Sequence, residues 1–226
     1  SNTKMIFKIC NIKEIKIYWK EDAVFRPGFE ANVDSVRLPV MFAKVSGVRN
    51  SNIEAYWNFI RELTGEDGFL ISAPVYIQNG QYEPLRVRYT EDFIKNGKLC
   101  RDVIKSSTRY KYSVMKEEMQ EHILDKIQLI LDRAPIKGMY ESGIEYTVIA
   151  TCLSLGSSIS NVIQRFDFTK KNPKLIYVNA TTEPISLEDS IMCLFLNYIG
   201  FDVLFFIPTG YNTVELYYKK DILLEH

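Results

Sequence analysis

The stretch that decides the fold reads KLIYV at residues 174–178, SLEDSIMCLFLNYIG at 186–200 and VLFFI at 203–207. The outer two segments are short runs of branched and aromatic residues, which is typical of strands covered on both faces. The middle segment is apolar on almost every side, so we expect a deeply buried helix. Strand, helix and strand within about 35 residues predict a βαβ unit with parallel strands.

Both ends of this helix carry boundary signals. Ser186 and Asp189 have the spacing of a capping box, and Gly200 suits the position after the last turn. The neighbouring carboxylates Glu188 and Asp189 would project about 100° apart on a helix, so they do not form a natural acid–base pair. Capping explains Asp189 better than catalysis does. Glu188 remains a candidate because it lies one turn from the predicted ligand edge.

Upstream, residues 5–19 predict a strand because Ile15 and Ile17 alternate with Lys16. Residues 37–46 and 69–72 predict two further strands, and 74–84 a loop. Between these strands we expect a helix that opens at Ser51 with Glu54 in a capping box, ends at Gly65, and buries one stripe of side chains. The stripe consists of Ile53, Tyr56, Trp57, Ile60 and Leu63.

The middle of the chain reads as helical. Residues 91–107 predict one or two short helices, and 113–133 predict a long one that stops at Ala134-Pro135. The long helix carries a stripe of Met115, Met119, Ile123, Ile127 and Ile130. Ser142 and Glu145 form a further capping box, and Ser157 or Ser158 can cap a short helix that runs to residue 163.

The fold expected from these segments is α/β, with a partly parallel sheet and a C-terminal Rossmann-like βαβ unit. Residues 3–135 supply strands and helices, and 136–226 supply helices leading into the βαβ unit. By length, we expect both parts to belong to one domain. Ser1-Asn2 resembles the scar of tag removal, and Leu224-Glu225-His226 fits either native sequence or a tag. We therefore expect a fragment of a longer protein, truncated at both ends.

Composition excludes several classes of protein. The chain has 226 residues with 28 basic and 28 acidic side chains, and 46% of its residues are hydrophobic. These values fit a globular domain, and a net charge of zero argues against coating nucleic acid or anionic lipid. No apolar run is long enough to span a membrane. The two His and the four Cys are scattered along the chain, so we expect no metal site. We also expect a cytoplasmic protein with reduced thiols. The cysteines are Cys10, Cys100, Cys152 and Cys193.

The predicted parallel strands place two polar tails at one edge of the sheet, where open α/β sheets bind ligands. The first tail contains Asn179, Thr181 and Thr182, and the second contains Thr209, Gly210, Tyr211 and Asn212. Neutral donors and acceptors beside an aromatic ring suit a sugar, a nucleoside or a phosphate. The alternative is that the second tail is an ordinary turn, because Gly and Asn are common turn residues.

A second candidate is the basic stretch at 86–116, which carries nine Lys and Arg side chains against three acids, with Tyr110 and Tyr112 among them. It could bind phosphate or nucleic acid. We favour a solvated helix face that is balanced by the following acids, which are Glu117, Glu118, Glu121 and Asp125. His122 lies among these acids, and we expect a structural role for it. Phosphate-loop, dinucleotide and nucleophile-elbow motifs are absent.

Five short motifs stand out, which are FDF at 166–168, NPKLI at 172–176, ISLED at 185–189, FDV at 201–203 and PTGYNTVE at 208–215. These motifs, together with residues 38–48 and YW at 56–57, resemble the bacterial YceG-like family of tellurite-type stress operons. The resemblance implies a component of a "biosynthetic module" that helps to make a nucleoside-like or sugar-like molecule. It transfers no catalytic residues and no cofactor, so enzymatic activity stays open. It adds Glu215, in the last motif, to the candidate ligand-binding residues.

We therefore expect a domain that binds a small polar or anionic ligand at the strand tips. The alternative is a non-catalytic scaffold or interaction module of a cytoplasmic stress complex, in contact with other components of the pathway. A pocket lined by both strand tips would favour the first hypothesis. An exposed apolar patch without a pocket would favour the second.

Overall fold

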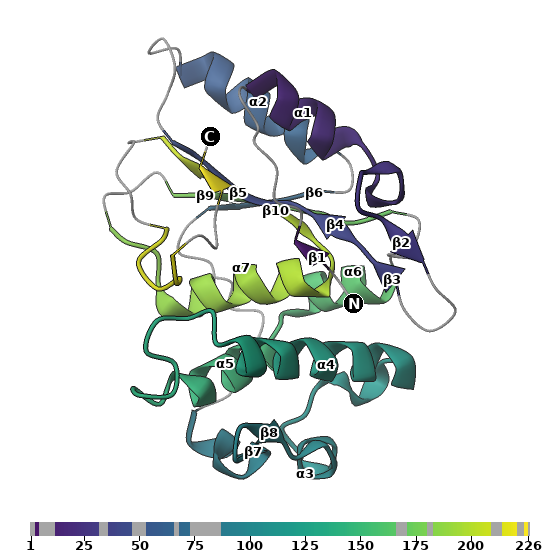
Figure 1. The fold of residues 1–226 in the computed structure, drawn as a ribbon, viewed down its shortest axis with the longest axis vertical. Helices are drawn as coiled ribbons and strands as arrows, with labels where there is room; N and C mark the ends of the chain where they lie inside the picture. The colour runs from purple at the N-terminus through teal and green to yellow at the C-terminus, as the bar shows by residue number, and fades with distance from the viewer. Residues whose placement is uncertain are drawn as a thin grey trace.

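A five-stranded parallel sheet forms the centre of the protein (Figure 1). The computed structural model describes residues 3–4, 12–31, 36–46, 53–65, 68–72, 87–165, 171–179, 183–208, 214–220 and 224–225. The strand order is β11-β5-β10-β9-β6, and neighbouring strands pair in parallel. Their bounds are Leu224–Glu225, Phe42–Ser46, Asp202–Ile207, Lys174–Val178 and Gly68–Ser72, in that order. The α/β class expected from the sequence is confirmed.

The predicted βαβ unit is also confirmed. β9 and β10 are adjacent, with Val203 opposite Leu175 and Phe205 opposite Tyr177. Helix α7 (Leu187–Ile199) joins them, and Ser186 caps it by accepting a hydrogen bond from the backbone N–H of Asp189 (3.1 Å). Every residue of β10 is buried, because α7 covers one face of the sheet and two N-terminal helices cover the other.

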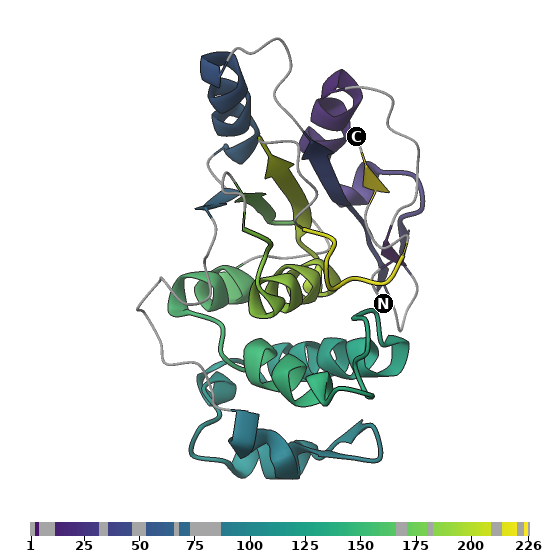
Figure 2. The same cartoon turned by 90° about the vertical axis from the view of Figure 1, so that its left-hand side faces the viewer.

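Alternation along the strands divides the core into two layers. On the α7 face the strands contribute Leu175, Tyr177, Val203, Phe205 and Ile207. On the opposite face they contribute Ile176, Val178, Leu204 and Phe206, which pack against Trp19, Ile60 and Leu63. Figure 2 shows the same layering from the side, with further helices stacked beneath α7.

The strand predicted at residues 5–19 is wrong where the structure describes it, because Ile12–Lys20 form helix α1. Ile17 is 60% exposed, whereas the next two side chains, Tyr18 and Trp19, are both buried. Two consecutive buried residues cannot belong to an alternating strand, but they fit one side of a helix. The indole N–H of Trp19 donates to the carbonyl of Leu63 (2.7 Å) and so fixes α1 against the next helix. Residues 5–11 lie outside the described residues.

The strand predicted at 37–46 exists as separate short segments, β3 (Val36–Arg37), β4 (Pro39–Val40) and β5. β3 pairs with β2 (Glu30–Ala31), and β4 pairs with β1 (Thr3–Lys4). The break before β5 has a physical cause. The N–H of Met41 donates to a carboxylate oxygen of Asp202 (2.9 Å), and a short 3-10 turn, η1 (Ala23–Phe25), lies upstream.

Helix α2 (Ile53–Thr64) and strand β6 follow as predicted. Ile60 and Leu63 are buried, Trp57 is half-buried, and Gly65 adopts the left-handed conformation (φ 57°). Ser51 and the loop predicted at 74–84 lie outside the described residues.

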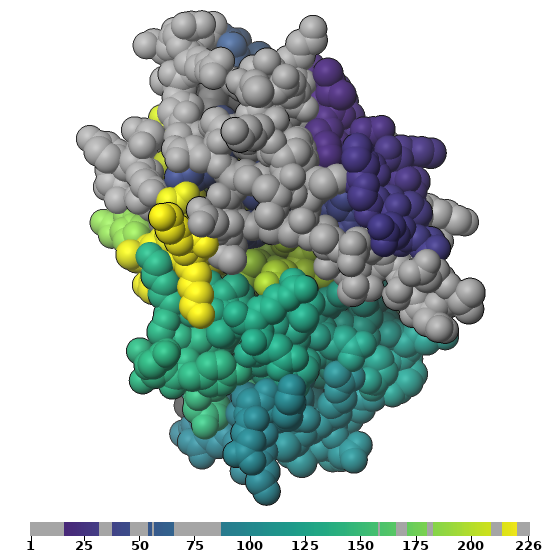
Figure 3. All heavy atoms as spheres, viewed as in Figure 1, coloured from purple at the N-terminus to yellow at the C-terminus, as the bar shows by residue number. Residues whose placement is uncertain are grey.

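A helical unit made of residues 87–165 has its last helix beside α7 (Figure 2) and the rest packed beneath α7 (Figures 1 and 3). It contains the 3-10 segments η3 (Val87–Phe93) and η4 (Tyr112–Val114), the hairpin β7–β8 (Ile94–Lys95 and Lys98–Leu99), and four helices. The helices are α3 (Arg101–Ser106), α4 (Glu117–Arg133), α5 (Ile144–Cys152) and α6 (Ser157–Arg165).

Two boundaries in this unit differ from expectation. α4 begins at Glu117 rather than at 113, because Tyr112–Val114 make a separate 3-10 turn. The capping box at Ser142 does not form: Gly143 stands at the N-cap of α5 with φ 70°, without a side-chain cap. Glycine adopts this left-handed conformation at little cost, so the chain turns into α5 without help from Ser142.

Candidate functional site

The carboxyl edge of the sheet is the site predicted from the sequence, and the structure describes two of its eight residues. These are Asn179, directly after β9, and Glu215, in the segment 214–220. Thr181, Thr182, Thr209, Gly210, Tyr211 and Asn212 lie outside the described residues. Because β9 and β10 are parallel neighbours, the two polar tails do leave the sheet at the same edge.

Asn179 is almost completely buried, and its hydrogen bonds fix the start of the segment that follows β9. Its backbone N–H donates to the carbonyl of Phe206 (2.9 Å), and its side-chain amide donates to the carbonyl of Glu183 (3.1 Å). The side chain therefore joins the end of β9 to the chain that leads into α7. Asn179 shapes this edge of the sheet.

Glu215 forms an ion pair that the sequence reasoning missed. Its Oε1 lies 2.5 Å from Nζ of Lys44, the central residue of β5. The Lys44 side chain is only 2% exposed, whereas that of Glu215 is 35% exposed. A charged residue between the buried Ala43 and Val45 was the available signal, because lysine rarely occupies a strand interior without a partner.

Lys44 lies on the face of the sheet that α7 covers. Phe42, two positions earlier, belongs to that layer and contacts Phe205 edge-on, with ring centroids 5.4 Å apart. Lys44 is the register partner of Phe205, which in turn lies opposite Tyr177. A single row across the sheet thus carries an amine, a phenyl ring and a phenol.

Tyr177, the phenol of this row, contacts the N-terminal turn of α7. Tyr177 donates its hydroxyl proton to Oδ2 of Asp189 (2.5 Å), and burial followed by the nearby Asp189 charge raises the pKa of Tyr177. Tyr218 donates to the carbonyl of Ser190 (2.6 Å), which ties the segment 214–220 to the same end of α7 (Figure 1). Ser186 thus caps the backbone N–H of Asp189, as expected, whereas the Asp189 carboxylate accepts a hydrogen bond from Tyr177, which the sequence did not predict.

A second charge cluster lies at the opposite, amino end of the sheet. The Arg26 guanidinium donates to both carboxylate oxygens of Asp202 (2.7 and 2.6 Å), and Lys174 pairs with the same carboxylate. Burial alone would raise the pKa of Asp202, but Lys174 and Arg26 outweigh it and lower the pKa to about 2. Because both carboxylate oxygens of Asp202 are bonded to buried cations inside the core, we assign this cluster a structural role.

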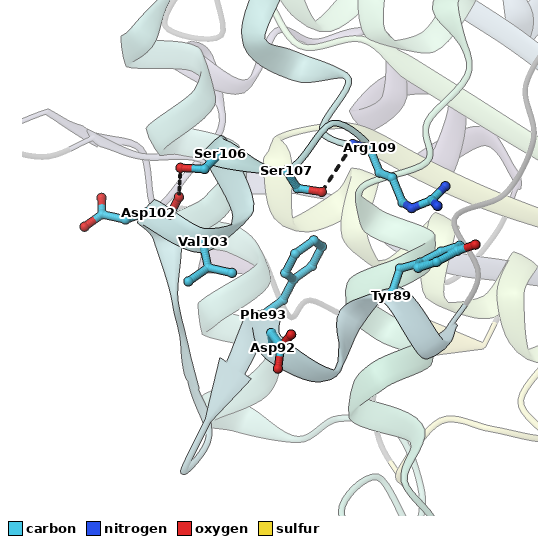
Figure 4. A pocket seen from close by; sticks show the side chains of 8 residues that line it. All are labelled: Tyr89, Asp92, Phe93, Asp102, Val103, Ser106, Ser107 and Arg109. Atoms are coloured by element: carbon cyan, nitrogen blue, oxygen red, sulfur yellow. Dashed lines mark hydrogen bonds between the residues drawn. The ribbon is translucent and has the colours of Figure 1, made fainter.

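One open pocket of about 520 Å³ is described in the helical unit, between η3 and α3 (Figure 4). Val103 and Phe93 face each other across it, and the guanidinium of Arg109 lies 3.3 Å from the ring centroid of Tyr89 at one end. The remaining lining residues are Asp92, Asp102, Ser106 and Ser107. No residue of the strand tips lines this pocket.

Three cations of the basic stretch, Lys98, Arg101 and Lys105, pair with acids of α4, which agrees with the solvated-face interpretation. Arg101 pairs with Glu121 and Asp125, and Lys105 pairs with Glu117 and Glu121. His122 is half-buried with Nε2 3.0 Å from the carbonyl of Ile199, and burial lowers its pKa. Its position between two helices fits the expected structural role.

The described part of the chain gives little support for metal binding or thiol chemistry. No cluster of three His, Cys, Asp or Glu side chains there could hold a metal ion. Cys152 and Cys193 are buried, and burial raises the pKa of both thiols. No helix in these ranges is both long and apolar enough to cross a membrane.

Comparison with known proteins identifies the family. The YceG domain matches residues 10–226. The uncharacterised protein YceG of Bacillus subtilis (strain 168) is 26% identical over 215 residues, which are 92% of this chain and 39% of that protein. The chain thus spans well under half the length of this relative. No solved structure matches the chain. Because the match covers nearly the whole sequence, the chain belongs to the YceG domain family.

Proposed function

We propose that this chain is the ligand-binding domain of a cytoplasmic protein that helps to make a nucleoside-like or sugar-like compound in tellurite-type bacterial stress resistance. The ligand binds at the carboxyl edge of the sheet, between the tails of β9 and β10. The binding residues are Asn179, Thr181, Thr182, Thr209, Gly210, Tyr211, Asn212 and Glu215.

The observation that carries this proposal is the Lys44–Glu215 ion pair. A lysine inside a parallel sheet loses its hydration, and a hydrophobic residue of similar size would commonly stabilise the core as well or better. A buried charge on the sheet face that leads to the ligand edge therefore favours a polar or anionic ligand. The uncharged tails beside it supply hydrogen-bond donors and acceptors without competing charge.

The test uses the full-length protein and mass spectrometry of the small molecules that co-purify with it. Asn212→Ala should reduce the amount of retained ligand, while the thermal midpoint changes little because an edge residue stabilises little of the core. Asn161→Ala, an exposed position on α6, is the matched control and should change neither quantity. A lower midpoint with normal ligand retention in Asn212→Ala would show that this residue only shapes a turn.

The pocket in the helical unit favours a second function, that of an interaction module. Val103 on its wall is 44% exposed, and an arginine stacked on tyrosine is common at protein interfaces. If the pocket holds a protein partner from the same pathway, Val103→Glu should remove a partner that co-purifies with the full-length protein. Val114→Glu, at a position that is 83% exposed and lies outside the pocket, should retain it.

A further inference from the structure

We propose that the pocket between η3 and α3 binds a segment of a partner protein in which an acidic residue stands close in sequence to a bulky apolar residue. The carboxylate of the segment meets Arg88 and Arg109, and its apolar side chain enters between Phe93 and Val103. This inference rests on the interaction-module function proposed for the pocket and specifies the chemistry of the partner.

Two arginines converge on the ring of Tyr89 at one end of the pocket. The guanidinium carbon of Arg109 lies 3.3 Å from the ring centroid and that of Arg88 lies 4.9 Å from it, and Nη2 of Arg88 donates to the Tyr89 hydroxyl (2.9 Å). Two positive charges at one ring repel each other, and an anion near both relieves this repulsion. A guanidinium stacked on a ring still presents the N–H groups along its edge, which suit bidentate recognition of a carboxylate.

Both arginines are exposed, and neither forms an ion pair with an acid in the described part of the chain. The contrast with their neighbours in sequence is clear, because Lys98, Arg101 and Lys105 are each paired with acids of α4. The positive charge at this end of the pocket is therefore available to a carboxylate of a partner.

An apolar surface adjoins the arginines. Val103 faces Phe93 across the pocket (Figure 4), and Val103 is 44% exposed whereas Phe93 is buried in the core. Covering the exposed valine with an apolar side chain removes apolar surface from water, which favours binding. The pocket volume of about 520 Å³ is larger than one bulky side chain, so the backbone that carries this side chain can also lie in the pocket.

The acids of the pocket argue against a polyanion such as nucleic acid. Asp102 lies beyond Val103, at the end of the pocket away from Arg109 (Figure 4), and Asp92 also lines the pocket. Neither carboxylate has a hydrogen bond or an ion pair with any residue that the structure describes. A nucleic acid carries a charge at every nucleotide and would meet these carboxylates as well. A peptide can place one acid at the arginines and apolar or basic side chains beyond it.

The experiment selects binders from a displayed library of random decapeptides on the immobilised full-length protein. The enriched peptides should carry an acidic residue close to a bulky apolar residue. A synthetic peptide of the most enriched sequence, and separately a single-stranded oligonucleotide, are then titrated by fluorescence anisotropy. Arg109→Glu is the test variant, and Lys95→Glu, at an exposed position of the same unit that does not line the pocket, is the matched control.

Arg109→Glu should weaken binding of the synthetic peptide at least about tenfold, because the reversed charge repels the carboxylate of the peptide. Arg88→Glu, at the second exposed arginine, should show a loss in the same direction and provides an independent check. Lys95→Glu should change the affinity less than about twofold, since solvent and salt screen distant surface charges. A second selection on Arg109→Glu should enrich basic residues where the first selection enriched acidic ones.

The inference is overturned if the selection yields no peptides, if the enriched peptides lack acidic residues, or if they bind Arg109→Glu as tightly as the unmodified protein. It is equally overturned if the oligonucleotide binds more tightly than the peptide and loses its binding in Arg109→Glu. Peptides that lack acids but depend on Val103 would leave the interaction-module function standing, whereas peptides that bind Val103→Glu unchanged would count against both. The ligand site at the carboxyl edge is tested separately by Asn212→Ala.

Discussion

Arg26 and Asp202 lie 176 positions apart in the sequence, yet their side chains meet through two hydrogen bonds of 2.7 and 2.6 Å in the core. The same guanidinium donates to the carbonyl oxygens of Tyr18 and Pro39. One side chain thus joins α1, the β4 segment and the start of β10. The sheet itself takes strands from both sides of position 135, so N-terminal residues are part of the core that supports the carboxyl edge of the sheet.

Arg26→Met should lower the free energy of unfolding by about 3–5 kcal/mol, because it leaves the buried Asp202 with Lys174 as its remaining cation. Urea denaturation measures the loss. Lys16→Met is the control, since Lys16 forms a partly exposed pair with Glu62 that solvent screens, so this substitution should change the stability little. Equal losses in the two variants would contradict the structural role of the Arg26–Asp202 pair.

Phe195→Ala should cost about 3–5 kcal/mol of unfolding free energy, because it leaves a cavity in a helix that is buried on almost every side. Phe25 is 72% exposed, so Phe25→Ala removes the same atoms with little effect. Chemical denaturation of the two variants compares them directly. A loss below about 1 kcal/mol at Phe195 would place that side chain outside the tightly packed core.

Lys126→Met should stabilise the protein by about 1–2 kcal/mol at neutral pH, because it removes a buried charge that the described residues do not pair. Burial lowers the pKa of Lys126 to about 8, below its value in the unfolded chain. The unfolded state therefore binds more protons above pH 8, and the stability of the unmodified protein should rise from pH 8 to about 10.5.

Urea titrations between pH 7 and 10 measure this effect. The advantage of Lys126→Met should shrink as the pH rises, while Lys137→Met, at an exposed position, shows no such trend. An advantage that stays constant over this range would show that the charge on Lys126 is not the cause.

Local patterns predicted the βαβ unit because its signals are short-range. The apolar run of β10, the Ser186 cap and the buried helix α7 each follow from a few neighbouring residues. The N-terminal helix was misjudged because the alternation of Ile15, Lys16 and Ile17 fits a strand. The contact of Trp19 with Leu63, which the local sequence does not reveal, favours a helix for this segment.

The sequence predicts part of the geometry of the candidate site. Parallel strand tips follow from the βαβ pattern, so the edge containing Asn179 could be anticipated. Lys44 could not be assigned to it, because nothing in the local sequence indicates that β5 inserts beside β10. The same holds for Arg26 and Asp202, whose pairing depends on how distant segments meet.

The most direct measurement is a crystal structure of the protein with its co-purified small molecule bound. We expect the ligand at the carboxyl edge of the sheet, between the tails of β9 and β10. A ligand seated instead in the pocket between Phe93 and Val103 would contradict this account.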